Sequence, residues 1–268
     1  MALVDTHCHL DFDAFDADRA EVIARAQEAG VDAIVNPSID TANAAKVVAL
    51  SQKTACVYAA VGVHPNSSTE WNARSADELR QLAQHSKVVA IGEIGLDYYW
   101  DDAPHDVQQK ALQAQLELAA EMELPVIVHN REASEDLLAI LLEWQAGLAN
   151  SANALAARPG VLHSFSGDQA MAERAVAAGY FLGFTGPLTF KNAPDLQAIA
   201  QQVPLERILV ETDSPFLSPH PLRGQRNEPA RVQLVAQKLA ELKGLPYDQV
   251  AAAASTNARQ LFGIEAQQ

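Results

Sequence analysis

The stretch LVDTHCHL, residues 3–10, begins with apolar and β-branched residues and ends with two histidines one position apart. Residues two positions apart on a strand share a face, so His7 and His9 are expected to point the same way and Cys8 the opposite way. Such a pair has three interpretations: zinc-finger ligands, histidines packed in a core, or the first half of a catalytic metal site. The rest of the sequence has to decide among these three interpretations.

Seven more short apolar segments follow, separated by longer stretches with helical periodicity. The eight expected strands are residues 3–7, 32–36, 57–63, 88–94, 125–129, 160–164, 180–184 and 207–212. Nearly continuous apolar runs of this kind are typical of strands buried on both faces of a parallel sheet. Eight strand–helix units predict the α/β class and a (β/α)8 TIM barrel, with residues 1–268 as a single domain. An open doubly wound sheet is the rival fold, but no glycine-rich dinucleotide motif follows any strand.

The stretches between the strands have apolar residues at three- and four-residue spacing, which predicts helices. Gly30 and Gly179 stand where two of these helices should end. Residues 145–160 are rich in Ala and Asn and are expected to form a loose surface connection. In the last helix, Leu261 and Phe262 are expected to pack onto the barrel.

The overall composition is that of a globular protein, with 49% hydrophobic and 20% charged residues. No apolar run reaches the roughly 18 residues of a membrane span, and the N-terminus resembles no export signal. Two cysteines, Cys8 and Cys56, are too few for a disulfide framework, so we expect a reduced, cytoplasmic protein. We also expect the protein to be a monomer. The net charge of −15 argues against an electrostatic grip on long duplex DNA, although bound divalent cations would reverse the field locally.

All strands of such a barrel end at one rim, where active sites of this architecture form. Polar residues at the expected strand ends are His7, His9, His64, Glu93, His129, Arg131, His163, Glu211 and Asp213. Four imidazoles and two carboxylates converging on one rim suit two divalent cations, so we favour a catalytic metal site with six ligands. A zinc finger is excluded because no CxxC or second close histidine pair is present. His64 is left outside the ligand set, because a lone histidine at a strand end is more often a hydrogen-bonded rim residue.

An aromatic run, Tyr98, Tyr99 and Trp100, follows the fourth expected strand. It has two interpretations that the sequence leaves open. It could be a platform on which nucleobases stack, or a loop that packs on itself.

Eight motifs, taken together, resemble the TatD family of metal-dependent deoxyribonucleases within the amidohydrolase superfamily. They are DTHCHLD (5–11), GVHP (62–65), GEIGLDYY (92–99), PVIVHNRE (125–132), LHSFSG (162–167), ETDSPFL (211–217), RGQRNEP (223–229) and STNARQLF (255–262). The resemblance covers essentially the whole chain. It implies a distorted TIM barrel that hydrolyses phosphodiester bonds in DNA, often as a 3′-to-5′ exonuclease. The sequence departs from the commonest form of the family motifs at Asn130, where Thr is frequent, and at Ser164, where Cys is frequent.

The resemblance also implies how the ligands divide between two divalent ions, Mg²⁺, Mn²⁺ or Zn²⁺. His7 and His9 would bind the first ion with Asp213, Glu93 would bridge both, and His129 and His163 would hold the second. Related branches of the superfamily often bridge with a carboxylated lysine, but no Lys stands at the expected strand ends, which favours Glu93.

Catalysis is expected to rest on Glu93 and Asp213, the latter accepting a proton from the attacking water. Asp213 could instead cap the turn that follows it. His64, Arg131 and Arg223 are the candidate contacts to substrate phosphates, although each Arg could equally pin a rim loop by ion pairing. Two rival functions remain: a lactonase, amidase or aminoacyl-ester hydrolase with the same metal centre, and a non-catalytic binding protein. The second is disfavoured because all six ligand positions are intact.

Overall fold

The structure, a computed structural model, describes residues 2–265. Within this range, strands alternate with helices in the order expected from the apolar segments. The strands are β1 (Leu3–Asp5), β2 (Val31–Pro37), β3 (Val57–Val61), β4 (Val88–Asp97), β5 (Val126–Arg131), β6 (Gly160–Leu162), β7 (Phe181–Phe184) and β8 (Ile208–Val210). Each overlaps the segment from which it was predicted.

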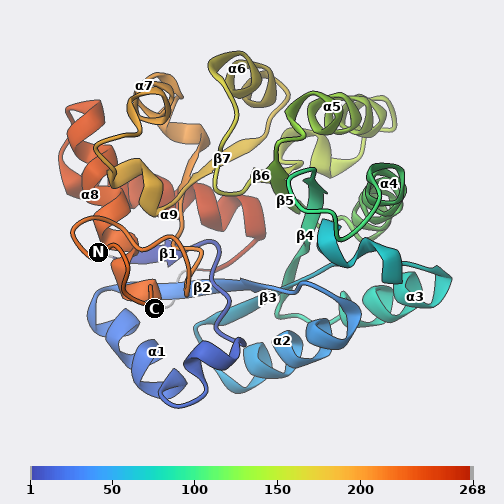
Figure 1. The fold of residues 1–268 in the computed structure, drawn as a ribbon, viewed down its shortest axis with the longest axis horizontal. Coiled ribbons are helices and arrows are strands. Elements are labelled where there is room, and N and C mark those ends of the chain that lie inside the picture. The colour runs from blue at the N-terminus through green and yellow to red at the C-terminus, as the bar shows by residue number, and fades with distance from the viewer. Residues whose placement is uncertain (1, 266–268) are drawn as a thin grey trace.

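Helices surround the strands, as Figure 1 shows for α1 to α8. The helices are α1 (Arg19–Glu28), α2 (Thr41–Lys53), α3 (Ala73–Leu82), α4 (His105–Met122), α5 (Ser134–Asn150), α6 (Gln169–Ala177), α7 (Pro194–Gln202), α8 (Val232–Lys243) and α9 (Tyr247–Phe262). Gly30 and Gly179 follow the ends of α1 and α6 with φ of 85° and 91°, a conformation that glycine adopts without strain. Among residues 2–265, no helix has the length and hydropathy needed to cross a lipid bilayer.

Each strand pairs in parallel with the next along the chain, from β1 through to β8. Past the ends of β1 and β8, Cys8 and Ser214 form an isolated parallel bridge. The backbone N–H of Thr6 also donates to the carbonyl oxygen of Val210 over 3.3 Å. These contacts bring the last strand beside the first, so the prediction of a (β/α)8 barrel is confirmed.

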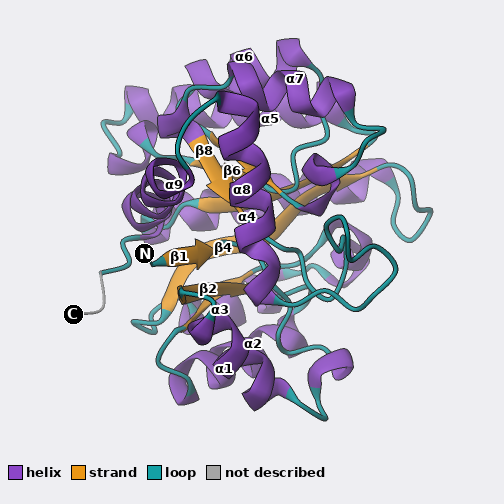
Figure 2. Ribbon diagram, turned by 90° about the vertical axis from the view of Figure 1, so that its left-hand side faces the viewer, coloured by secondary structure: helices purple, strands orange, loops and turns teal. Residues whose placement is uncertain are grey.

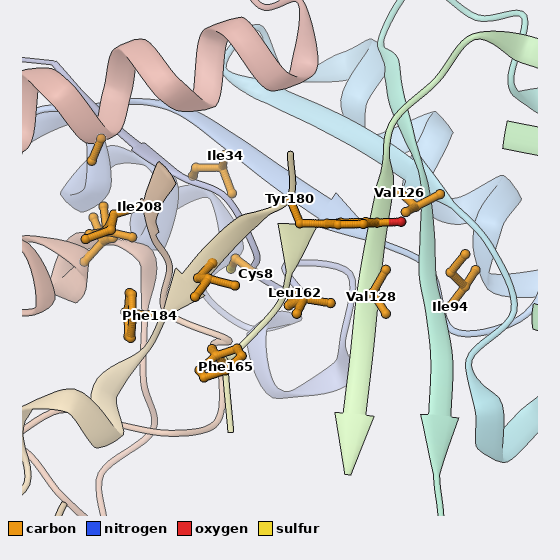
Figure 3. Packing of buried hydrophobic residues seen from close by; sticks show 14 of the residues in the cluster. Cys8, Ile34, Ile94, Val126, Val128, Leu162, Phe165, Tyr180, Phe184 and Ile208 are labelled. Atoms are coloured by element: carbon orange, nitrogen blue, oxygen red, sulfur yellow. The ribbon is translucent and has the colours of Figure 1, made fainter. Parts of the chain in front are cut away.

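Alternate strand residues contribute to two separate apolar layers, because successive side chains of a strand point to opposite faces. Ile127 of β5 belongs to an inner layer to which all eight strands contribute. Its neighbours Val126 and Val128 belong to an outer layer that also contains the buried faces of the helices. Figure 3 shows part of this outer layer, with Tyr180 lying across the strands beside Leu162 and Val126.

Helix α9 covers the end of the barrel at which the strands begin. Leu261, Phe262 and Ile264, at and just beyond its C-terminal end, pack against the inner layer. Figure 2 shows α9 on the left, on the side from which β1 starts. The predicted packing of Leu261 and Phe262 onto the barrel is therefore confirmed, and only the opposite rim remains for a site.

Residues 145–160 are not the loose connection that their composition predicted. Helix α5 continues to Asn150 and buries Leu148, and the short 3-10 helix η3 (Ala154–Ala157) buries Leu155. The side-chain amide of Asn153 donates to the carbonyl oxygen of Ala120 over 3.2 Å. The segment is thus held in place by two buried leucines and by a hydrogen bond to α4.

Asp5, the last residue of β1, connects β1 to the segment after β8. Its buried carboxyl group accepts hydrogen bonds from the backbone N–H of Thr212 (2.9 Å) and from the Thr212 hydroxyl (2.6 Å). Burial raises the pKa of Asp5 to about 8, against the effect of these donors. On its other side, Thr212 accepts from the Asn227 amide over 2.9 Å. The segment after β8 is therefore held from two directions.

We expect Asp5→Ala to lower the free energy of unfolding by about 2–4 kcal/mol, because the Thr212 amide and hydroxyl would lose a buried acceptor. Urea denaturation at constant pH measures the change. Asp101→Ala, which alters an exposed carboxylate, is the control and should stay within about 0.5 kcal/mol of the wild type. An equally small effect of Asp5→Ala would contradict the role given to Asp5.

Candidate metal centre

The carboxyl ends of the strands surround a cavity of about 800 Å³. Five of the six predicted ligands line it: His9, Glu93, His129, His163 and Asp213. The sixth, His7, is fully buried and lies against His9. Sequence reasoning therefore selected residues that the fold gathers in one place, on strands that lie far apart in the chain.

Four side-chain atoms of this set converge: Nε2 of His7, Nε2 of His9, Oε2 of Glu93 and Oδ1 of Asp213. The two imidazole nitrogens lie 3.2 Å apart. Glu93 Oε2 lies 3.3 Å from His7 Nε2 and 3.7 Å from His9 Nε2, and Asp213 Oδ1 lies 3.7 Å and 3.6 Å from the same atoms. Ligands bound at about 2.0–2.2 Å in a tetrahedral site are roughly 3.4 Å apart. His7, His9 and Asp213 are close enough together to hold one divalent cation, and Glu93 lies beside them.

The closure of the barrel produces this convergence. The backbone N–H of His9 donates to Ser214 and that of Asp213 donates to His7, each over 2.8 Å. Cys8 packs into the outer apolar layer, so His7 and His9 turn together toward the site, as predicted. Both lie beyond the observed end of β1, however, in an extended segment held by these bonds. Asp213 has a φ of 55°, a conformation that Asp tolerates better than most residues.

A second group forms on the other side of Glu93. Its Oε1 lies 3.0 Å from His129 Nδ1 and 3.8 Å from His64 Nε2. The three side chains are close enough to hold a cation together. His64 was predicted only as a substrate contact, and the structure instead brings it within reach of the ligands. The two oxygens of Glu93 thus face two different pairs of histidines.

Asp97 completes this side of the centre, and the sequence analysis did not assign it. His129 lies between the two carboxylates, with Nδ1 toward Glu93 and Nε2 3.0 Å from Asp97 Oδ2. Glu93, Gly95 and Asp97 alternate along β4, and Gly95 pairs in register with His129. A Cβ at Gly95 would lie 2.0 Å from the His129 carbonyl oxygen, so only glycine allows this approach. The two-residue spacing of the carboxylates was the available signal.

His163 is placed differently from its predicted role beside His129. Its ring stacks on that of His7, with centroids 3.4 Å apart. Its Nδ1 lies 2.8 Å from Oε1 of the fully buried Glu211, and its Nε2 lies 3.7 Å from Asp213 Oδ1. Glu211 stood at a strand end without an assigned role. His7, His163 and Glu211 form a third group with metal-ligand spacing.

The charges of these groups follow from burial and from their partners. Burial lowers the pKa of His129, but hydrogen bonds to Asp97 and Glu93 outweigh it and raise the pKa to about 9. Burial likewise lowers the pKa of His163, but Glu211 raises it to about 10. At His64 burial prevails and the pKa falls to about 4, so this ring is neutral at pH 7 and able to ligate.

Glu93 and Asp213 remain ionised despite their burial. Burial alone would raise the pKa of each carboxyl group. At Glu93, the charge of His7 and hydrogen bonds from His129 and His7 hold the pKa well below its usual range. At Asp213, a hydrogen bond from His9 and the charge of His163 lower the pKa. The residues therefore supply the charged oxygens and imidazole nitrogens that a divalent cation needs.

The two predicted arginine contacts have different positions. Arg131, at the end of β5, lines the cavity, and its guanidinium lies 3.8 Å from the ring centroid of Tyr99 and 5.5 Å from that of Trp100. Arg223 is exposed, lies over the ring of Phe190 and does not line the cavity. The structure thus brings Arg131, but not Arg223, to the candidate ligands.

A family model described as TatD related DNase matches residues 4–263. The chain belongs to the TatD family. One curated relative, "Uncharacterized metal-dependent hydrolase YabD" of Bacillus subtilis (strain 168), is 40% identical over 98% of this chain and 99% of its own length. Another, "3'-5' ssDNA/RNA exonuclease TatD" of Erwinia amylovora, is 35% identical over 98% of this chain and all of its own length. The crystal structure of YjjV, a TatD homolog from Escherichia coli K12, superposes with a TM-score of 0.90 at 36% identity and covers 98% of both chains.

These findings confirm the resemblance carried by the sequence motifs and make the chain a metal-dependent hydrolase. The two departures from the common TatD wording lie just outside the candidate ligands. The Asn130 amide donates to the Ser134 hydroxyl over 3.0 Å, at the start of α5. The backbone N–H of Ser164 donates to Glu211 Oε1 over 2.5 Å. The Ser164 side-chain hydroxyl lies 2.8 Å from the Thr185 hydroxyl.

We expect the chelator-treated protein to become less stable as the pH rises from about 7 to about 10. The folded pKa values of His129 and His163, about 9 and about 10, lie above the ordinary value near 6.5 of an unfolded chain. The folded state therefore binds protons that the unfolded state has released, and stability falls with pH across this window. Melting temperatures measured at intervals from pH 6 to 11 test this.

His220→Ala changes an exposed histidine and should show the same decline as the wild type. His163→Ala should decline less, because one of the two raised pKa values is then absent. A chelated protein with equal melting temperatures at pH 7 and pH 10 would contradict the direction of these shifts.

Proposed function

We propose that this TatD-family hydrolase is a two-metal deoxyribonuclease that removes nucleotides from the 3′ ends of single-stranded or frayed DNA. The observation that carries the two-metal part is the orientation of Glu93. Its Oε2 faces His7 and His9, and its Oε1 faces His129 and His64. A carboxylate placed in this way suits a bridge between two cations.

We assign His7, His9 and Asp213 to the first cation, with Glu93 shared, and His129 to the second. His163 or His64 completes the second set; His64 is neutral at pH 7, and His163 points Nε2 toward Asp213. When bound, a pair of divalent cations supplies a nucleophile at neutral pH and charge stabilisation for both the attacking and leaving oxygens of a phosphodiester. Asp97 and Glu211 hold the rings of His129 and His163 in orientation from behind.

Asp213 is the proposed general base. Asp213 lines the cavity, and its pKa is lowered, so it is ionised at neutral pH and can accept a proton from the attacking water. The carboxylate faces His7, His9 and His163, whereas the following turn is closed by a backbone bond from Phe216 N–H to the Asp213 carbonyl oxygen. This arrangement favours the catalytic role over a cap for the turn.

Two observations support a nucleic acid as the substrate. The Erwinia amylovora relative is named for exonuclease activity on single-stranded DNA and RNA. Arg131 also lines the cavity and offers a bidentate contact to a phosphate group. A guanidinium also binds carboxylate groups, so a lactonase, amidase or aminoacyl-ester hydrolase is kept as the alternative in the experiments.

We expect chelation to abolish hydrolysis and added Mn²⁺ to restore it, with about two ions bound per chain. Glu93→Gln should lower both bound metal and turnover more than His9→Ala does, because a bridging group serves both ions. Elemental analysis and initial rates on the same preparations test this. Full activity after chelation, or wild-type metal content in Glu93→Gln, would exclude a two-metal centre bridged by Glu93.

Elemental analysis of His64→Ala and His163→Ala also shows which of these two histidines completes the ligand set of the second cation. Removing the true ligand should lower the bound metal by about one ion per chain, whereas removing the other should leave the metal content unchanged. His220→Ala is the matched control, because it removes an exposed histidine at no candidate site.

We expect Asp213→Asn to reduce turnover by about 10²–10⁴-fold, the usual scale of general acid–base catalysis. The melting temperature should change little, and metal at the His129 side should remain. Asp102→Asn, an exposed change in the loop after β4, is the control. Near wild-type turnover together with earlier melting would make Asp213 a structural residue.

The substrate is tested with oligonucleotides labelled at the 5′ end. We expect progressive shortening from the 3′ end of single-stranded DNA, little action on closed circular DNA, and a shallow dependence on salt, because the acidic chain displaces few counterions. RNA, a lactone and an aminoacyl ester are the comparison substrates. Rapid internal nicking of closed circles, or turnover of the lactone or ester alone, would overturn the proposal.

A further inference from the structure

The large hydrophobic side chains that stay exposed in residues 2–265 are Tyr99, Trp100 and Phe216. Trp100 and Phe216 both line the cavity of the candidate metal centre, and Tyr99 packs edge-on against Trp100 with ring centroids 4.8 Å apart. Single exposed hydrophobic side chains are normal, but several that gather in one place often mark a binding site. Their gathering at this cavity points to a ligand that has flat apolar faces.

The two rings lie on opposite sides of the cavity mouth. Trp100 follows β4 and Phe216 follows β8, and these strands are half the barrel apart in the sheet order. Trp100 lies on the side of His129 and Arg131. Phe216 lies on the side of His9, with centroids 6.4 Å apart, and packs edge-on against Phe12. The candidate cation ligands therefore stand between the two rings.

Each ring is tied to a carboxylate residue of the centre. The backbone N–H groups of Tyr99 and Trp100 donate to Asp97 Oδ1 over 3.0 Å and 3.2 Å. The backbone N–H of Phe216 donates to the Asp213 carbonyl oxygen over 2.9 Å. The backbone of each ring-bearing residue is thus tied to a residue that would bind the cations.

The charges on the cavity wall favour base stacking, rather than ion pairs with phosphates, as the main source of binding energy beyond the cations. Arg131 is the one Lys or Arg among the described lining residues, whereas Glu93, Asp97 and Asp213 are all acidic. Phosphates on either side of the reacting one would find little attraction there. Nucleobases stack on aromatic side chains whatever the sequence, since every base has a π face.

Given the proposed function, we propose that Trp100 and Phe216 stack on the nucleobases on either side of the scissile phosphate. The strand then lies across the mouth, with its bases on the two rings and the reacting phosphate at the cations. Paired bases in a duplex are already stacked on their neighbours and cannot occupy both positions. The aromatic pair therefore selects single-stranded or frayed nucleic acid, without preference for sequence.

The experiment compares a thymidine oligonucleotide with the same oligonucleotide made abasic at its two 3′-terminal residues. Trp100→Ala and Phe216→Ala should each reduce kcat/KM on the intact oligonucleotide by about tenfold or more, mainly through KM. On the abasic oligonucleotide the wild type should already be slow, and the same substitutions should cause little further loss. Trp100→Phe and Phe216→Tyr, which keep a ring, should recover most of the activity.

Asp101→Ala, beside Trp100 but without a ring, is the control and should behave like the wild type on both substrates. If the two alanine substitutions lower kcat/KM by the same factor on the intact and the abasic oligonucleotide, the stacking proposal is wrong while the nuclease function stands. If the wild type neither binds nor cleaves any oligonucleotide but turns over a lactone or ester, both proposals are wrong.

Discussion

Three backbone hydrogen bonds hold the segment after β1 against the segment after β8, from Thr6 to Val210, from Asp213 to His7 and from His9 to Ser214. They close the barrel, and they also set two histidines and an aspartate from opposite ends of the chain within 4 Å of one another. The Asp5 carboxylate and the Asn227 amide hold Thr212 in the same segment. The geometry of these candidate ligands is therefore a direct product of the closure of the fold.

The sequence predicts the strands well, because each is a short apolar run buried on both faces and bounded by polar residues. It also predicts which polar residues reach the rim, because the ends of parallel strands meet there. The sequence does not predict which side chain each histidine ring of the candidate metal centre contacts. Whether His64 or His163 lies nearer His129 depends on side-chain rotamers and on the approach of β5 to β4 at Gly95, which are tertiary properties. Asp97 and Glu211 were missed for the same reason, since their contacts join different strands.

The same centre shows how an acidic chain keeps several buried carboxylates ionised. Glu93, Asp97, Glu211 and Asp213 each face at least one imidazole, and their pKa values are lowered in spite of burial. The pKa values of His9, His129 and His163 are raised in turn, so these imidazoles hold protons that they would have to lose to bind a cation. Metal affinity and proton affinity are thereby coupled at this rim, so that loading with metal releases protons.

The packing of α9 against the N-terminal ends of the strands limits how a substrate can reach the barrel. Leu261, Phe262 and Ile264 close that end, and the inner layer fills the space between the strands, so the described barrel is a solid core without a passage. A polymer cannot be threaded through it. Substrate and product must share one opening, and each released fragment has to leave by the route along which the next segment arrives.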